Sequence, residues 1–163
     1  MIVGESKFSC AVEGRQVVKS KLICIFVVTL SLGAGGPAES EKKEFAKIAG
    51  AWSVSELTYD GEVHKHKFKV VFKGNEGTVE GNDKVTNEYS KIKFKLDPSA
   101  KPKAMDITIA AGSQTDATMQ GIYELKDDEL RICAKVFGAG RPKEFAAPDG
   151  SSTVLLVLKK ESK

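Results

Sequence analysis

The segment Gly121 to Ala134, GIYELKDDELRICA, decides the fold class of this protein. Its apolar residues recur at every second position on both sides of an acidic break at Lys126 to Asp128. A period of two is typical of strands with one buried face, and a short polar break between two such runs is typical of a tight turn. The segment therefore predicts a β-hairpin.

Similar alternation continues on both sides of this hairpin, so we expect further antiparallel strands. The predicted strands are Gly50 to Tyr59, residues 67–73, Thr78 to Glu80, Tyr89 to Leu96, Met105 to Ile109, Met119 to Leu125, Glu129 to Ala134 and Thr153 to Leu158. Eight short strands joined by polar turns indicate an all-β closed barrel or sandwich. A chain of 163 residues has room for one such domain.

Turn residues and lysines support this assignment. In residues 67–73 and 89–96, lysines alternate with aromatic and aliphatic residues, which predicts an apolar inner face and a solvated outer face. The first strand changes face between Val54 and Leu57, as a β-bulge or bend would produce. Asp60-Gly61 then favours a type I′ hairpin turn.

Residues 1–38 are predicted to be a cleaved signal peptide. Leu22 to Leu32 is an apolar run too short to cross a bilayer as a helix; lysines precede it and small residues follow at once. A buried core helix is the alternative, and the glycines and proline that follow disfavour it. We expect cleavage after Ala38, with a cut after Gly35 also open, and a secreted or periplasmic protein with no stable membrane anchor.

The net charge argues against two classes of partner. The whole chain carries a formal charge of +3, and without residues 1–38 it holds 21 basic and 20 acidic residues, or +1. Nucleic acids and anionic membranes are bound by a clustered excess of Lys and Arg, so neither is expected as a partner. Cys133 is the one cysteine after residue 38, so the domain has no intramolecular disulfide and depends on its hydrophobic core.

Two segments flank or interrupt the barrel domain, residues 50–163. Residues 39–49 form a charged lead-in, in which Phe45 and Ile48 predict a short helical turn that packs against one barrel end beside Trp52. Residues 137–152 form a long loop with three glycines and two prolines. Loops of this length are usually functional or mobile, so we expect this loop to be the most mobile part of the domain and to lie over one barrel end.

Motifs spread over nearly the whole chain after residue 38 together resemble one family. They are Gly50-Ala51-Trp52, Phe72-Lys73-Gly74, Leu96-Asp97-Pro98, Lys101-Pro102-Lys103 with Asp106, Gly121 to Leu125 with Leu130 and Ile132-Cys133, Arg141-Pro142 with Phe145, and Val154 to Lys160. The chain resembles small secreted lipocalin-like domains of unknown function that are abundant in planctomycete bacteria. The resemblance implies an eight-stranded antiparallel lipocalin-like (calycin-type) barrel and a secreted location, with no established chemistry to carry over.

The chain also shares one motif with lipocalins in general, and it departs once from lipocalins proper and once from the resembled family. Gly50-Ala51-Trp52 is similar to the Gly-x-Trp motif of lipocalins in general, in which the tryptophan closes one barrel end. The Thr-Asp-Tyr-like element of lipocalins proper is absent, and Ala134 stands where the resembled family usually has an aromatic residue.

A barrel of eight strands can hold a small molecule in its interior. The large residues expected to face inward are therefore candidate ligand-binding residues: Trp52, Phe68, Phe72, Phe94, Met105, Met119 and Tyr123. Arg141 and Phe145 of the long loop are candidates for a lid, with Arg141 meeting an anionic partner. Alternatively, Arg141 anchors the loop to a strand carboxylate while Phe145 packs down as a lid.

Two other patterns have a structural alternative. Glu62, His64 and His66 alternate and could share one face as metal ligands, but a closed site needs three or four ligands. We expect a solvated hairpin rim and no metal there. Cys133 could be a reactive thiol, although its place next to Ile132 in a strand favours a packed position.

The expected function is binding of a small apolar ligand without catalysis. No Ser, His and Asp set and no pair of buried carboxylates is legible, so neither an enzyme nor a cofactor is expected. The alternative is a structural or protein-interaction barrel whose large inward residues fill the interior; the sequence identifies no protein partner. An interior cavity of roughly a few hundred Å³ would favour the ligand-binding barrel.

Overall fold

The computed structural model describes residues 39–82, 84–136, 138 and 140–162. These residues belong to one compact unit. The predicted signal peptide, residues 1–38, lies outside the described residues, and its cleavage stays a prediction. Within the described ranges, no helix combines the length and the apolar composition needed to cross a membrane.

Two helices and nine strands make up the described part of the chain. In order they are α1 (Glu39–Ile48), β1 (Gly50–Tyr59), β2 (Glu62–His64), β3 (Phe68–Lys73), β4 (Glu76–Gly81), α2 (Lys84–Glu88), β5 (Lys91–Asp97), β6 (Ala104–Ala111), β7 (Thr118–Lys126), β8 (Glu129–Lys135) and β9 (Thr153–Lys160).

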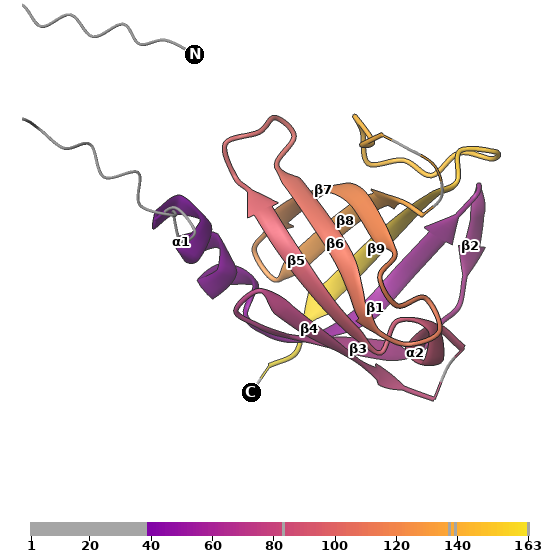
Figure 1. The fold of residues 1–163 in the computed structure, drawn as a ribbon, viewed down its shortest axis with the longest axis horizontal. Coiled ribbons are helices and arrows are strands. Elements are labelled where there is room, and N and C mark those ends of the chain that lie inside the picture. The colour runs from indigo at the N-terminus through magenta and orange to yellow at the C-terminus, as the bar shows by residue number, and fades with distance from the viewer. Residues whose placement is uncertain (1–38, 83, 137, 139, 163) are drawn as a thin grey trace, which may run out of the picture. The chain divides into compact units, whose positions relative to one another are not determined.

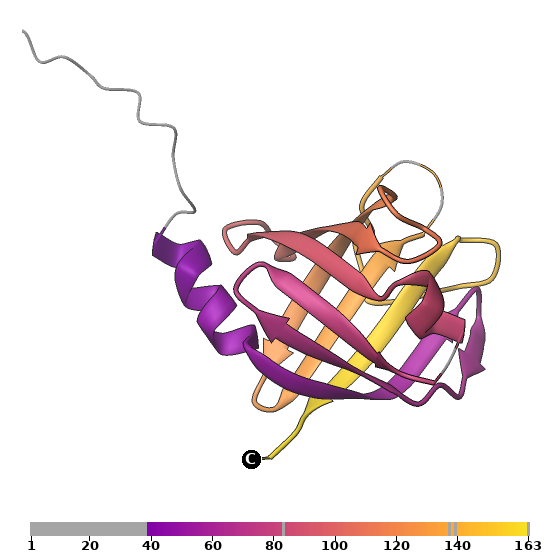
Figure 2. The same ribbon diagram turned by 60° about the horizontal axis from the view of Figure 1, so that its bottom comes forward.

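The strands form one antiparallel sheet that closes on itself (Figure 1). Neighbours follow the order β2-β1-β3-β4-β5-β6-β7-β8-β9, and β1 also pairs with β9. β3 pairs with the first part of β1 and β2 with its last part, so β2 and β3 together take the place of one interrupted strand. Figure 2 shows the strands side by side around the interior, with α1 and α2 at opposite ends. The predicted all-β, eight-stranded antiparallel lipocalin-like barrel is confirmed.

The predicted hairpin is the pair β7–β8. Tyr123 lies opposite Ile132, and Lys126 lies opposite Glu129, so only Asp127 and Asp128 form the turn. Asp127 has a positive φ of 52°, which aspartate tolerates better than most residues. The acidic break in the sequence is therefore the turn that fixes the register of these two strands.

The bulge predicted in β1 is also present. The pairing of β1 with β9 shifts between Val54 and Glu56, so Trp52 and Leu57 are both buried although an odd number of positions separates them. At the end of β1, Asp60 and Gly61 both have positive φ, 52° and 84°, as a type I′ turn requires. Both local predictions for this strand are confirmed.

The chain differs from the sequence-based expectation in its helices. The lead-in is a ten-residue helix, α1, rather than a single turn. The five-residue helix α2 and the short strand β2 are not among the predicted elements, and the strand after α2 begins at Lys91 rather than at Tyr89. A helix this short has no room for a repeating apolar face, so periodicity could not reveal it.

Candidate functional site

The interior of the barrel is empty at one end. A cavity of about 500 Å³ lies inside the sheet at the end that carries β2 and α2. Its wall is mostly apolar and includes Phe68, Val70, Phe72, Met119, Ile132 and Leu156. Pockets of roughly 300–1,000 Å³ with apolar walls are the usual sites for small molecules.

The candidate residues divide between the two ends of the barrel. Phe68, Phe72 and Met119 line the cavity. The other four inward residues, Trp52, Phe94, Met105 and Tyr123, are fully buried and do not line it.

These four residues fill the end covered by α1. Phe94 packs edge-to-face on Phe45 of α1 at 5.5 Å between ring centroids, and on Phe72 at 5.4 Å. Because Phe72 lines the cavity and Phe94 does not, this pair of rings forms part of the cavity floor. The interior is therefore packed at one end and open at the other.

The rim of the cavity is polar. It carries Tyr59, His64, His66, Tyr89 and the pair Lys84 and Glu88, whose charged groups lie 3.6 Å apart. The rings of Tyr59, His64 and His66 follow one another at centroid distances of 6.5 and 6.0 Å, and Phe68 continues the row at 6.4 Å from His66. Burial, followed by the charge of Glu88, raises the pKa of Tyr89, so its phenol stays protonated at neutral pH.

Helix α2 is held at this rim by the loop between β6 and β7. The amide of Ser113 donates to the carbonyl of Asn87 at 3.2 Å, and the amide of Gln114 donates to that of Glu88 at 3.4 Å. Gly112, at φ +124°, lies so close that a Cβ there would be 2.2 Å from the Glu88 carbonyl oxygen. Only glycine fits this contact, so the approach of α2 to the cavity depends on Gly112.

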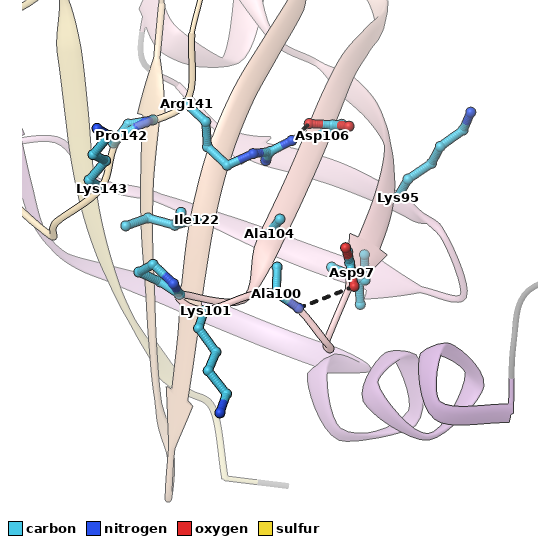
Figure 3. Close-up of a pocket in the computed structure, with 12 residues that line it drawn as sticks. Lys95, Asp97, Ala100, Lys101, Ala104, Asp106, Ile122, Arg141, Pro142 and Lys143 are labelled. Atoms are coloured by element: carbon cyan, nitrogen blue, oxygen red, sulfur yellow. Dashed lines mark hydrogen bonds and ion pairs between the residues drawn. The ribbon is translucent and has the colours of Figure 1, made fainter.

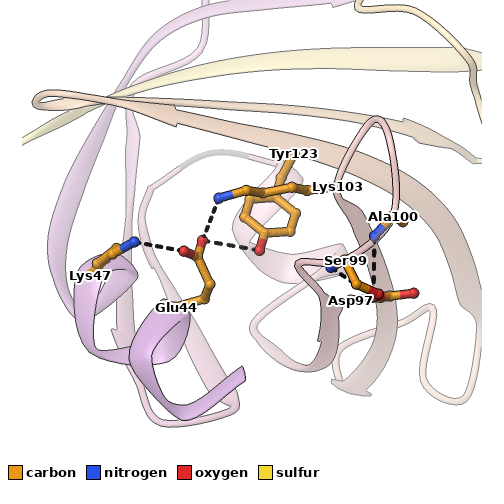
Figure 4. A network of polar contacts seen from close by, with 7 residues as sticks. All are labelled: Glu44, Lys47, Asp97, Ser99, Ala100, Lys103 and Tyr123. Carbon is orange, nitrogen blue, oxygen red and sulfur yellow. Dashed lines mark hydrogen bonds and ion pairs between the residues drawn. The ribbon is translucent and has the colours of Figure 1, made fainter. Parts of the chain in front are cut away.

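At the opposite end, a buried carboxylate attaches α1 to the barrel (Figure 4). Glu44 accepts hydrogen bonds from Lys47 at 2.8 Å, from Lys103 at 3.0 Å and from the hydroxyl of Tyr123 at 3.2 Å. Its side chain is only 7% exposed. Burial alone would raise the pKa of Glu44, but hydrogen bonds and charge from the two lysines outweigh it and lower that pKa. Glu44 therefore stays ionised under α1.

Trp52 closes the same end. Its side chain is fully buried, and its Nε1 donates a 2.7 Å hydrogen bond to the carbonyl of Ile48 at the end of α1. The ammonium of Lys160 lies 5.2 Å from the ring centroid. The polar edge of the indole is therefore satisfied by the helix it packs against.

Arg141 does not lie over the barrel mouth. Its guanidinium contacts the outer face of β6 and β7: it donates to Asp106 at 2.6 Å, to the carbonyl of Met105 at 3.2 Å and to the carbonyl of Gly121. Figure 3 shows Arg141 reaching toward Asp106. Both residues line an outer groove of about 450 Å³, to which Lys101 and Lys143 also belong. Arg141 thus anchors the loop to a strand carboxylate, Asp106, as the second alternative expects, and it does not line the cavity.

Phe145 is likewise outside the barrel. Its ring centroid lies 5.0 Å from the guanidinium of Arg131 on the outer face of β8. The next residue of this loop, Ala146, covers Cys133. Cys133 is fully buried, and its thiol donates to the carbonyl of Ala146 at 3.4 Å. Burial raises the pKa of the Cys133 thiol, as expected of a packed rather than a reactive cysteine. The loop thus covers the outer face of β8, and none of its described residues lines the cavity.

The structure also shows where the residues of the weak metal pattern lie. His64 and His66 line the cavity rim, whereas Glu62 is exposed on β2. Among the described residues, no three His, Cys, Asp or Glu side chains are grouped closely enough to hold a metal ion.

Sequence reasoning missed Glu44 and α2. The partners of Glu44, Lys103 and Tyr123, lie 59 and 79 residues away, so no local signal reveals the network. For α2, Asn82-Asp83 before Lys84 is a helix-start pattern that could have indicated the helix.

No protein-family model, no curated protein and no solved structure matches this chain. The resemblance to secreted lipocalin-like domains therefore stays a hypothesis, and the site must be interpreted from its own geometry.

Proposed function

We propose that this protein is an exported, non-enzymatic binding protein that holds a small apolar molecule inside its barrel. The observation that supports the proposal best is the apolar interior cavity of about 500 Å³. Removing apolar surface from water stabilises a complex by about 25 cal/mol per Å². A ligand that fills this cavity would cover side chains that otherwise face empty space, such as Phe68 and Leu156.

The filled-interior alternative fits only part of the barrel. Trp52, Phe94, Met105 and Tyr123 fill the end under α1, which stabilises the fold. The end that carries β2 and α2 is not filled, and protein interiors are ordinarily packed without large voids. A purely structural barrel would have no need of this volume, so the open end favours ligand binding.

Export and family membership are part of the same proposal. They are supported by the apolar run Leu22 to Leu32 with the small residues after it, and by the motifs shared with secreted lipocalin-like domains. A binding barrel outside the cytoplasm would receive small molecules from its surroundings.

Binding of a neutral fluorescent probe tests the proposal. We expect N-phenyl-1-naphthylamine to bind the purified mature domain with one-to-one saturation. Met119 is half-buried on β7 and lines the cavity. Met119→Trp therefore places a bulky indole ring in the cavity and should abolish binding while the domain stays folded. Val79→Phe does the same from β4 if the first variant is unstable. Lys101→Gln, in the outer groove, should bind as the wild type does.

The proposal fails if the probe does not bind to the folded wild type. It fails equally if the cavity-filling variants bind the probe with unchanged affinity, because the probe would then lie elsewhere.

A further inference from the structure

The rim of the cavity has a different chemistry from its wall, and this difference points to a class of ligand. The wall is apolar, whereas the rim collects ionisable groups from four parts of the chain. They are Tyr59 of β1, His64 of β2, His66 between β2 and β3, and Lys84, Glu88 and Tyr89 in and after α2.

The charges at the rim nearly cancel at neutral pH. Lys84 and Glu88 lie 3.6 Å apart, and the Glu88 side chain is the less exposed of the two, at 28% against 85%. Because their charges offset each other, Glu88 repels an entering anion less than an isolated carboxylate would. The phenol of Tyr89 stays protonated in this range and can donate a hydrogen bond.

His64 and His66 bring two imidazole rings to the rim. Histidine is the side chain that ordinarily gains its charge between about pH 8 and 5. The two imidazole rings have a centroid distance of 6.0 Å, and both face the cavity. When both are protonated they repel each other, and an anion placed at the rim offsets that repulsion.

We infer, building on the proposed function, that the cavity binds an amphipathic molecule with one anionic head group. The apolar part fills the wall beside Phe68 and Met119, and the head lies at the rim against His64 and His66. The row of rings from Tyr59 through His66 to Phe68 connects the rim to the wall, so one elongated ligand can contact both.

The direction of the pH dependence follows from linkage. An anion binds better to the protonated imidazoles, so its affinity rises as pH falls through the range in which histidine gains its charge. By the same linkage, the bound anion favours protonation of His64 and His66. A neutral ligand of the same shape has no such coupling.

A matched pair of fluorescent probes tests the inference. N-phenyl-1-naphthylamine is neutral, and 8-anilino-1-naphthalenesulfonate has the same aromatic skeleton with a sulfonate that stays charged. We expect the affinity of the sulfonate to rise by about tenfold between pH 8 and pH 5.5, because a favourable contact between partly exposed charges changes an affinity by about a factor of ten. The affinity of the neutral probe should stay constant. Circular dichroism at each pH verifies that the domain is folded.

Variants assign the effect to the two histidines. In the double variant with His64→Gln and His66→Gln, the rise in sulfonate affinity at low pH should disappear while the neutral probe still binds. Lys101→Gln with Lys143→Gln, in the outer groove, should keep the full rise. If the double histidine variant does not fold, proton NMR of the wild type replaces it, because the chain has only two histidines. The sulfonate should then move both imidazole titrations to higher pH.

The outcomes separate the two proposals. If the neutral probe binds but sulfonate affinity is independent of pH, or if its rise survives removal of both histidines, the head-group inference is wrong and the binding function stands. If the sulfonate does not shift the imidazole titrations in the NMR experiment, the head-group inference is likewise wrong. If neither probe binds the folded protein, the binding function itself is wrong.

Discussion

Glu44 and Tyr123, 79 residues apart, share a 3.2 Å hydrogen bond that joins α1 to the closed end of the barrel. The carboxylate is buried and ionised, and the phenol that donates to it is 1% exposed. Burial, followed by the charge of Glu44, raises the pKa of Tyr123, so the phenol remains a donor. The end of the barrel is thereby closed by a helix with a charged attachment beneath it.

The stabilisation from Glu44 should depend on pH. Folding lowers the pKa of Glu44 below its ordinary value of 4.5. The ionised group therefore stabilises the fold above pH 4.5, and this contribution is lost as the pH falls through the folded pKa. We expect Glu44→Gln to cost about 1–3 kcal/mol at neutral pH, the range for hydrogen bonds to a charged group, and much less in acid. Urea unfolding at several pH values measures this. Glu39→Gln, at an exposed site on the same helix, should cost little; equal losses at all pH values would contradict the prediction.

Trp52 should be a major contributor to stability. Trp52→Ala removes a fully buried ring and should cost about 3–5 kcal/mol in denaturant unfolding. Trp52→Phe keeps most of the apolar contact but leaves the Ile48 carbonyl without its donor, and should cost less. A loss below about 1 kcal/mol for the alanine variant would mean that the ring does not close the barrel end.

Gly112 should matter more than its place in a loop suggests. In Gly112→Ala the new methyl group meets the Glu88 carbonyl, so α2 must move away from the rim. Gly74→Ala is the matched control: it also has positive φ, +59°, but no atom lies within 4 Å of the added group. We expect the Gly112 variant to lose about 1–3 kcal/mol more than the control and to bind the neutral probe more weakly. Equal behaviour of the two variants would show that α2 does not depend on this contact.

Arg141 should protect the thiol of Cys133. Arg141→Gln removes the charged contact with Asp106 that fixes the long loop, so reaction of Cys133 with a thiol reagent should accelerate several-fold. Lys143→Gln, exposed in the same loop, is the control and should react at the wild-type rate. If both variants react slowly, the loop has other anchors that suffice without Arg141.

The exported protein should begin near Glu39. An apolar run of this length with small residues after it is typically cleaved rather than packed. Amino-terminal sequencing of protein recovered from outside the cytoplasm tests this. A mature chain that retained Leu22 to Leu32 would refute both the signal peptide and the exported location.

The sequence by itself determined most of the strands, the turns that join them into hairpins and the orientation of the strand faces. The alternation in Gly121 to Ala134, the turn at Asp60-Gly61 and the bulge after Val54 are local features, because each strand buries one face and each turn has its own φ requirements. The resemblance to lipocalin-like domains selected the barrel from the architectures that such strands permit. The candidate residues Phe68, Phe72 and Met119 were correctly placed by the same alternation.

Only the tertiary structure decided what the ends and the outside of the barrel do. The pairing of Arg141 with Asp106 and of Glu44 with Tyr123 joins residues far apart in the chain, so no pattern in either segment reveals it. Whether large inward side chains fill a barrel depends on how closely they pack against one another across the interior. Here Phe94 lies in the packed end, and Phe72, in contact with it, lines the cavity. The polar rim follows for the same reason: closure of the sheet brings His64 and α2 to one mouth, because strands distant in sequence become neighbours only when the barrel closes.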